Sequence, residues 1–336
     1  MKIPMASTRN FFTVPQEISR ALPSDVSIHC LLALDLMRAM DTDLELMPWR
    51  KIVPTFSEMK NAFPYFWELG LQDALPHLVK EIVLKQRTRL HRDAGLVLKQ
   101  FPHVSQEAFE YAWFLINTRT FYHFEDEMKK YPEDDRLALL PLADMFNHAD
   151  VGCRVTFSTS GYEVLANRKY QKGEEVFISY GEHSNDYLLG EYGFLPAENQ
   201  WDAICLDETI LTAFNETQTK YFKQRCGSGH LMVYTDNTVS PEMLAAVDIL
   251  CCGTESGQVV RNARRDVGKL STIFEKVVTD YTKEVKDTWE TLRSARVWDS
   301  TKYDVLNMRW EQILTKLELL FGLIKNYDLV LKIRGS

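Results

Sequence analysis

LADMFNHADVGC, residues 142–153, places the polar pair Asn147 and His148 shortly after Asp144 and ahead of an apolar segment. Further along, EEVFISYGEHSNDYLLGEYGF, residues 174–194, contains an apolar run that ends at Tyr180 and is followed at once by Gly181. Runs of β-branched and aromatic residues bounded by turn residues are typical of strands. The two stretches therefore predict a polar turn that lies near the end of a strand carrying a phenol.

Three short apolar runs follow the Asn147–His148 pair. They are CRVTF at 153–157, YEVLA at 162–166 and EVFIS at 175–179, separated by STSG and QKGE. Both separators are rich in residues that favour turns. We expect three short strands, of which the first two form a hairpin.

Helical spacing of apolar residues is seen on both sides of these strands. A helix is predicted from Val26 to Met40, with Ser24 or Asp25 as its N-cap. One long surface helix is predicted from Gln72 to Lys99, and another from Ser105 to the NTRTF stretch. In the last third, helices are expected at 244–252, 259–280 and 304–325, so this part reads as a helical domain.

The composition limits the classes of partner. The chain has 336 residues, 45% of them hydrophobic, and a formal net charge of −8, so it offers no large positive field to a nucleic acid. Its start lacks the apolar segment of a signal peptide, and no run of about 18 apolar residues is present. We predict a soluble cytoplasmic protein, with the nucleus as the alternative, and neither a nucleic-acid nor a membrane partner.

Motifs for other chemistries are missing from the sequence. The six cysteines form no CxxC pair, and His148 and Cys153 lack a second pair of zinc ligands, so no metal site is predicted. P-loop, HExxH and GxSxG motifs are not found. CGSGH at 226–230 is interpreted as a loop, and RNARR at 261–265 as a solvated basic helix face that could also dock an acidic partner.

Four motifs follow one another in a specific order: NTRTF, LLPLADMFNHAD, GEEVFISYGEHSND and LLGEYGFLPAENQWD. In order and spacing they resemble the SET-domain methyltransferases of the Rubisco large-subunit lysine methyltransferase type, including their fungal relatives. The resemblance is clear from Ala112 to Cys205 and looser on both sides. It implies an α+β fold, in which a SET-domain β fold with a threaded crossing carries a helical insert and a helical C-terminal domain similar to the family's substrate-binding domain.

The resemblance also implies a division of the chain. Residues 1–25 and 110–200 would form the SET core, 26–109 the helical insert and 201–336 the C-terminal domain. The family's SET domains open with a glycine-rich strand pair that contacts the cofactor. No such pair precedes KIPMASTRNFFTVP, residues 2–15, so the N-terminal part of the core is expected to be incomplete.

The resemblance implies S-adenosylmethionine as cofactor and a protein side chain as substrate, lysine of a non-histone protein first and histidine second, docked on the C-terminal domain. Tyr180 matches the family's phenol at the methyl-transfer centre. The cofactor-binding positions implied are Arg119, Asp144, Asn147, His148 and Tyr180. The aromatic residues expected to line the substrate channel are Phe121, Tyr122, Tyr192 and Phe194.

The residue types suit this chemistry. Methyl transfer from a sulfonium requires an uncharged amine placed in line with the methyl carbon, so positioning dominates catalysis. An amine with a pKa of about 10.4 loses its proton more readily in an apolar, aromatic channel. Ring faces also attract the sulfonium or a methylated ammonium. The Asn-His turn would hold the methyl donor, and Tyr180 would orient the acceptor amine.

Structural interpretations of the same residues remain open. An Asn-His pair at a turn is often a local cap, and a tyrosine at a strand end is often only a packed ring. Two alternative functions therefore stand beside the methyltransferase. One is a catalytically silent SET-like module that binds a protein, and the other is a SET-derived enzyme that acts on a small metabolite without methyl transfer.

Overall fold

The computed structural model describes residues 1–227, 229–252, 254–255, 258–259, 267–294 and 300–325. The described chain is a mixture of helices and short strands, and it divides into two compact units. The first comprises Met1–Tyr65, Ile82–Glu182 and Glu191–Gly193, and the second comprises Phe66–Glu81, His183–Gly190 and the rest of the chain from Phe194. The division into insert, core and C-terminal domain made from the sequence stays a prediction. The basic stretch 261–265 lies outside the described residues.

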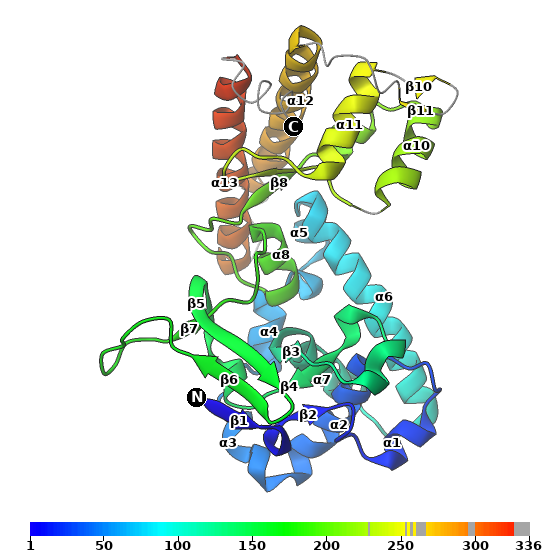
Figure 1. The fold of residues 1–336 in the computed structure, drawn as a ribbon, viewed down its shortest axis with the longest axis vertical. Coiled ribbons are helices and arrows are strands. Elements are labelled where there is room, and N and C mark those ends of the chain that lie inside the picture. Colours follow the sequence, from blue (N-terminus) through cyan, green and yellow to red (C-terminus); the bar gives the residue numbers. More distant parts are fainter. Residues whose placement is uncertain (228, 253, 256–257, 260–266, 295–299, 326–336) are drawn as a thin grey trace. The chain divides into compact units, whose positions relative to one another are not determined.

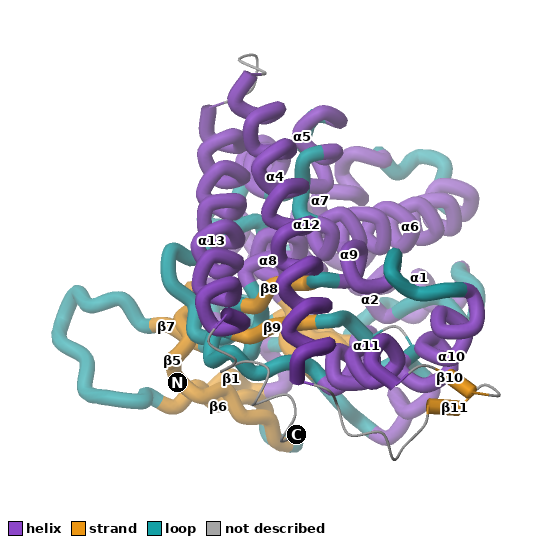
Figure 2. The backbone as a smooth tube through the Cα atoms, turned by 90° about the horizontal axis from the view of Figure 1, so that it is seen from above, coloured by secondary structure: helices purple, strands orange, loops and turns teal. Residues whose placement is uncertain are grey.

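The first unit contains two small sheets (Figure 1). One has the strand order β1-β6-β5-β7, and the other has the order β2-β4-β3. In both views the loop that joins β6 to β7 extends away from the sheet (Figures 1 and 2). The strands are β1 (Lys2–Pro4), β2 (Arg9–Asn10), β3 (Thr120–Tyr122), β4 (Leu137–Leu139), β5 (Asn147–Ser158), β6 (Gly161–Leu165) and β7 (Phe177–Ile178).

The predicted hairpin is confirmed, because β5 and β6 pair antiparallel with Ser158 opposite Gly161. Two strand boundaries differ from the prediction. β5 begins at Asn147, and β7 is limited to two residues. The reason is the pairing: β7 runs parallel to β5 and meets it at Asn147 and His148, then again at Cys153 across a bulge.

The crossing of β5 and β7 is very close at Gly152. A Cβ atom at this position would lie 2.4 Å from the carbonyl carbon of Ile178 and 2.6 Å from the nitrogen of Ser179. Real Cβ atoms do not approach backbone this closely, so only glycine fits. The close approach of β7 therefore requires glycine at position 152 in the bulge of β5.

Helices dominate the chain from Gln16 to Arg119. The predicted helix after Ser105 is confirmed with Ser105 as its N-cap. The long helix predicted from Gln72 begins instead at His77, because a turn ends the preceding helix and Pro76 has no N–H to continue it. These helices are α1 (Gln16–Ala21), α2 (Ile28–Thr42), α3 (Met47–Arg50), α4 (Phe56–Ala62), α5 (Leu69–Asp73), α6 (His77–Gln100) and α7 (Gln106–Arg119).

The N-terminus of α2 corrects a second boundary. Its cap is Ser27, whose hydroxyl accepts from the Cys30 nitrogen at 3.0 Å, rather than Ser24 or Asp25. The first two N–H groups of the helix, those of Ile28 and His29, donate at 2.7 and 2.9 Å to the carboxylate of Asp135. Asp135 lies more than a hundred residues away, in a short 3₁₀ turn. A tertiary contact thus completes the cap that local sequence starts.

The second unit is mainly helical and also contains a two-stranded sheet, β8 (Ala203–Cys205) with β9 (Met232–Tyr234), that the sequence patterns do not predict. Arg309 on α13 is fully buried and donates to Asp186 at 2.6 Å and to Asp202 at 2.9 Å. This buried ion pair ties α13 to the loops around β8. The helices are α8 (Asn185–Tyr187), α9 (Asp207–Leu211), α10 (Glu216–Cys226), α11 (Pro241–Cys252), α12 (Val267–Ser294) and α13 (Ser300–Lys325), with a short β10–β11 pair at Thr254–Glu255 and Gln258–Val259.

Among the described residues, no helix has the length and apolar character needed to cross a bilayer.

Replacing Gly152 by alanine should destabilise the protein by about 2 kcal/mol or more, because the new methyl group meets backbone that cannot move away. Gly95 on α6 is a matched control, since a Cβ there meets nothing within 4 Å. Gly95→Ala should raise the stability by about 0.5–1 kcal/mol. Urea denaturation measures both, and equal stability of the two variants would contradict the crossing.

His29 predicts an acid sensitivity. Its Nε2 lies 3.0 Å from the Trp113 carbonyl and its Nδ1 lies 3.2 Å from Arg89, an arrangement that requires the neutral imidazole. Burial lowers the pKa of His29 to about 3, and the charge of Arg89 adds to this. The pKa of His29 in the folded protein lies below its unfolded value of about 6.5. The contribution of His29 to the free energy of unfolding is therefore complete above pH 6.5 and is lost as the pH falls towards 3.

His29→Gln removes this titration. The free energy of unfolding of the wild type should therefore fall more steeply than that of the variant below pH 6.5, by up to about 1.4 kcal/mol per pH unit. Urea denaturation between pH 7 and 4 measures the difference. His103→Gln, at an exposed position, should leave the slope unchanged. Parallel profiles for wild type and His29→Gln would show that His29 does not titrate as described.

Candidate functional site

The parallel pairing of β5 with β7 brings His148 close to Tyr180, which lies just after β7. The Tyr180 N–H donates to the Nδ1 atom of His148 at 3.0 Å, and the two ring centroids lie 5.2 Å apart. Nδ1 is therefore the acceptor nitrogen, and Nε2 lies 3.6 Å from Asp150. The His148 side chain is almost fully buried and fixes the main chain of Tyr180.

The Tyr180 hydroxyl is also fixed. It donates to the Phe146 carbonyl at 2.8 Å. Burial raises the pKa of Tyr180, the nearby Arg119 opposes the rise, and Asp144 adds to it. The phenol is consequently neutral at physiological pH, and one hydroxyl lone pair can accept a hydrogen bond from a ligand.

The four aromatic candidates for a channel have different environments. The Tyr192 ring lies 5.0 Å from that of Tyr180 at an interplanar angle of 39°. Phe121 packs against the buried Ala138 and Tyr162 and also against the buried cluster that Tyr180 contacts. Tyr122 is 54% exposed, and Phe194 belongs to the second unit. The structure thus brings Tyr192 to Tyr180 and packs Phe121, which is partly buried, against the same cluster as Tyr180.

Arg119, at the end of α7, is held by Asp144. Its Nη1 donates to the Asp144 carbonyl at 2.9 Å and to the Asp144 carboxylate at 3.2 Å. The same carboxylate accepts from the Trp49 indole at 2.8 Å. Burial raises the pKa of Asp144, while Arg119 and Trp49 favour its charged form. The Asp144 side chain is completely buried. Its role in this structure is therefore to orient Arg119.

Asn147 differs from its neighbour His148, because it is exposed. Its Nδ2 donates to Glu175 at 2.6 Å. The two residues predicted to act together therefore differ in their environments. The buried His148 side chain holds the main chain of Tyr180, and the Asn147 side chain faces solvent beside β7.

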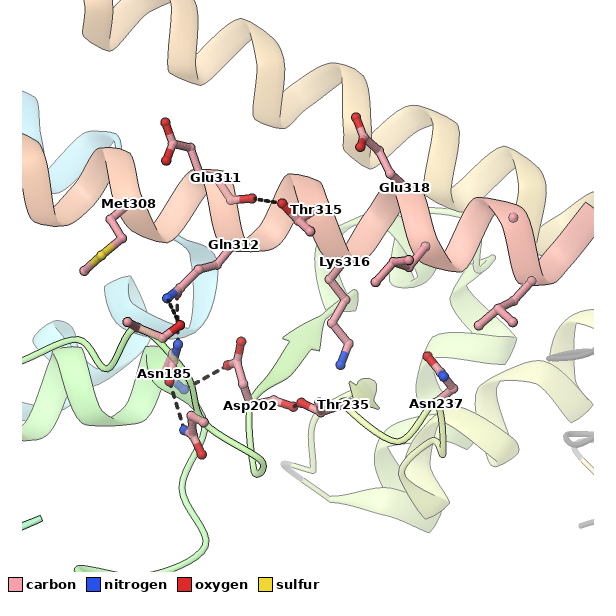
Figure 3. Close-up of a pocket in the computed structure, with 15 residues that line it drawn as sticks. Asn185, Asp202, Thr235, Asn237, Met308, Glu311, Gln312, Thr315, Lys316 and Glu318 are labelled. Atoms are coloured by element: carbon pink, nitrogen blue, oxygen red, sulfur yellow. Dashed lines mark hydrogen bonds between the residues drawn. The ribbon is translucent and has the colours of Figure 1, made fainter. Parts of the chain in front are cut away.

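The second unit has a cavity of its own, about 810 Å³ in volume, between α13 and the loops at 197–202 and 235–237. Figure 3 shows Lys316 extending from α13 towards Thr235 and Asn237, while Glu311 and Glu318 point away. The Lys316 Nζ atom is buried and has no hydrogen-bond partner among the described residues. Burial lowers the pKa of Lys316 to about 8, although Asp202 and Asp236 oppose this.

Sequence reasoning missed three of these groups. Trp49 lies in a proline-broken segment, 95 residues before Asp144, and no local pattern links the two. The acceptor for Tyr180 is the backbone carbonyl of Phe146, which a sequence cannot specify. Lys316 is one of several lysines on a helix, and only the fold shows that its amine is buried.

Comparisons with known proteins find a family model that matches the part of the chain containing Arg119, His148 and Tyr180. The SET domain family model matches residues 26–181. The chain is 35% identical over 141 residues to the ribosomal lysine N-methyltransferase set11 of Schizosaccharomyces pombe. This match covers 42% of this chain and 36% of the relative. It is 30% identical over 161 residues to the human SET domain-containing protein 4, which covers 45% and 37%. The chain thus spans just over a third of the length of these curated relatives.

A solved structure has the same fold. The SET domain of LSMT, bound to lysine and AdoHcy, superposes with a TM-score of 0.64 at 17% identity, over 98% of this chain and 82% of that one. The predicted SET-type α+β fold and the resemblance to the Rubisco methyltransferases are confirmed. The matches do not test the roles predicted for individual site residues.

Asp144→Ala should lower the stability by about 3 kcal/mol, because it leaves the Arg119 charge and the Trp49 indole without their buried partner. Trp49→Phe removes one donor and keeps the ion pair, so it should cost only about 1–2 kcal/mol. Thermal and urea unfolding of the two variants test this order. A smaller loss for Asp144→Ala than for Trp49→Phe would contradict it.

Proposed function

We propose that this chain, which carries a SET domain, is an S-adenosylmethionine-dependent methyltransferase that acts on a protein side chain, with lysine as the acceptor. The observation that carries the proposal is the neutral Tyr180 phenol, fixed at both its hydroxyl and its main-chain nitrogen. The relatives named lysine N-methyltransferases, and the solved SET domain bound to lysine and AdoHcy, support it. The ribosomal relatives favour a cytoplasmic location.

The residues around Tyr180 fit such a cofactor. Both hydrogen bonds of Arg119 to described residues come from Nη1, and a guanidinium carries five N–H donors. Donors on Nε and Nη2 therefore remain for the carboxylate of a bound amino-acid group. The paired rings of Tyr180 and Tyr192 present π faces that attract an onium group. S-adenosylmethionine would supply its methyl group from a sulfonium centre.

Tyr180 then acts by position rather than as a base. With its pKa raised, the phenol keeps its proton and donates it to the Phe146 carbonyl. The oxygen lone pair can accept an N–H from the acceptor amine and so direct the nitrogen lone pair towards the methyl carbon. The aromatic surroundings disfavour the ammonium, which helps the amine to lose its proton to solvent.

The Asn-His pair would serve the same complex in two ways. His148 holds the Tyr180 main chain, so its effect on the cofactor is indirect. Asn147 is exposed and offers an amide that could leave Glu175 for a cofactor group. We assign direct contact to Asn147 and positioning to His148 and Asp144.

The protein substrate is proposed to dock on the second unit. Its cavity presents the buried ammonium of Lys316 among the amides of Asn185, Asn199 and Gln312. A buried cation without a partner is costly, so an anionic group in this cavity would be bound favourably. An acidic side chain of the substrate protein matches this chemistry.

Tyr180→Phe tests the catalytic assignment. The ring packing remains while the hydroxyl is lost, so affinity for S-adenosylmethionine should stay within about threefold, whereas methyl transfer should fall about tenfold or more, equivalent to about 1.4 kcal/mol of transition-state stabilisation. Isothermal titration measures binding, and transfer of tritiated methyl groups to proteins of a cell lysate measures activity. Mass spectrometry of the labelled protein distinguishes lysine from histidine.

Tyr170→Phe is the matched control, since its phenol bonds to Asn167 on the exposed loop before β7. It should retain full activity. Equal labelling by wild type and Tyr180→Phe would remove Tyr180 from the mechanism. If the wild type neither binds S-adenosylmethionine nor labels any protein, the silent binding module becomes the better description.

Asn147→Ala should weaken cofactor binding about tenfold with little change in melting temperature, because the side chain is exposed and makes no core contact. Glu175→Gln changes the side chain that Asn147 bonds to in the free protein. It should keep the affinity for S-adenosylmethionine within about threefold of the wild-type value. Titration calorimetry and thermal unfolding measure the two effects. A drop in melting temperature with unchanged affinity would make Asn147 a structural residue.

A further inference from the structure

Three potential metal ligands converge in the second unit, whereas Tyr180 belongs to the first. They are Cys205 at the end of β8, Asp207 at the start of α9, and His230 just before β9. One ligand atom from each lies within 4.8 Å of the other two. The antiparallel pairing of β8 with β9, in which Cys205 faces Met232, brings these distant residues together.

Asp207 lies at the centre of this group. One carboxylate oxygen accepts from the Leu231 nitrogen at 2.6 Å, and the other lies 2.8 Å from Nδ1 of His230. The Cys205 thiol also forms a hydrogen bond to Asp207. Cys205 and Asp207 are buried, so the group is preorganised inside the fold rather than on a mobile surface.

The second nitrogen of His230 has an acidic neighbour too. Its Nε2 lies 3.6 Å from Glu81, so a carboxylate faces each side of the ring. A neutral imidazole can donate from only one nitrogen. At 2.8 Å the donor is Nδ1–H, with the Asp207 carboxylate as acceptor. A metal ion on Nδ1 would replace this proton, and the neutral ring would then carry its proton on Nε2, facing Glu81. A carboxylate on the outer nitrogen is also the usual support of a histidine that binds a metal.

Acidic groups collect in the pocket that leads to Asp207. This pocket, about 870 Å³, is lined by Glu81, Asp207, Glu208, Asp280 and Glu284, together with His77 and one lysine, Lys276. Lys276 pairs with Asp280 at 2.6 Å. The excess of negative charge would attract a divalent cation, and the pocket gives it a path from solvent.

We propose that Cys205, Asp207 and His230 bind one transition-metal ion, with Zn²⁺ as the preferred ion and a water molecule from the acidic pocket in the fourth position. A thiolate and an imidazole together select zinc over calcium or magnesium, which prefer oxygen ligands. On binding, the thiol loses its proton to solvent and sulfur forms the metal bond, so one proton is released for each ion.

The ion would join the β8–α9 connection to the segment before β9. Its function would be structural, since binding to the folded state alone stabilises that state. The site is independent of the methyl-transfer proposal, because none of its ligands lies among the residues assigned to the cofactor or to Tyr180.

The test uses the full chain freed of metal with a chelator and then dialysed. Equilibrium dialysis against Zn²⁺ should give one ion per chain, and Co²⁺ should give the absorption band of a thiolate-to-cobalt charge transfer. Cys205→Ser and His230→Gln should each weaken Zn²⁺ binding at least tenfold, and Cys205→Ser should abolish the cobalt band. Cys226→Ser, at a half-buried cysteine on α10, is the matched control and should retain both.

Circular dichroism establishes that each variant is folded. If the variants do not fold, the wild type still decides: Zn²⁺ should protect Cys205 from alkylation, as mapped by mass spectrometry. Folded wild type without a thiolate-to-cobalt band, or alkylation of Cys205 at the same rate with and without Zn²⁺, would overturn the proposal. The three residues would then form only a hydrogen-bonded network around Asp207.

Discussion

The parallel contact between β5 and β7 determines the geometry of the first unit. It is only a few residues long, yet it requires a glycine at 152, places a bulge in β5 and delivers Tyr180 to His148. A two-residue strand contributes little stability through its own hydrogen bonds. The contact persists because the buried Cys153, Val164 and Ile178 pack together on one face of the sheet. Steric fit at one backbone position and apolar packing beside it therefore fix where the phenol lies.

The site is built outward from this contact by groups that are themselves restrained. His148 is bonded to the main chain of Tyr180, and Arg119 is bonded to Asp144, which in turn holds Trp49. Each side chain thus has few alternative rotamers, which reduces the entropy that a bound ligand would have to remove. A rigid arrangement of this kind suits a reaction that depends on alignment rather than on strong acid–base chemistry.

Local patterns predict the elements but not their long-range partners. Apolar spacing locates α2, α7 and α13, and the four motifs draw attention to Asn147, His148 and Tyr180. The α2 cap is misplaced because a distant aspartate completes it, and β8 and β9 are missed because three-residue strands carry almost no periodic signal. The cysteine, aspartate and histidine around Asp207 escape notice for a related reason. Their relation exists only through strand pairing, whereas metal motifs are recognised by short, regular spacing.

The contact of Asp135 with the start of α2 also affects when α2 can become fully capped while the chain is being synthesised. The acceptor is made 107 residues after the Ile28 nitrogen that it binds. At roughly 5–20 residues per second, the first turn of α2 would wait for about 5–20 s after its own synthesis before its cap is complete. During that interval the helix depends on Ser27 alone, and its apolar face has no partner in α7 until that helix has also been made. The N-terminal segment is thus most exposed to chaperones and to aggregation while the rest of the first unit is still being made, and it becomes protected when α7 and the turn that carries Asp135 have been synthesised.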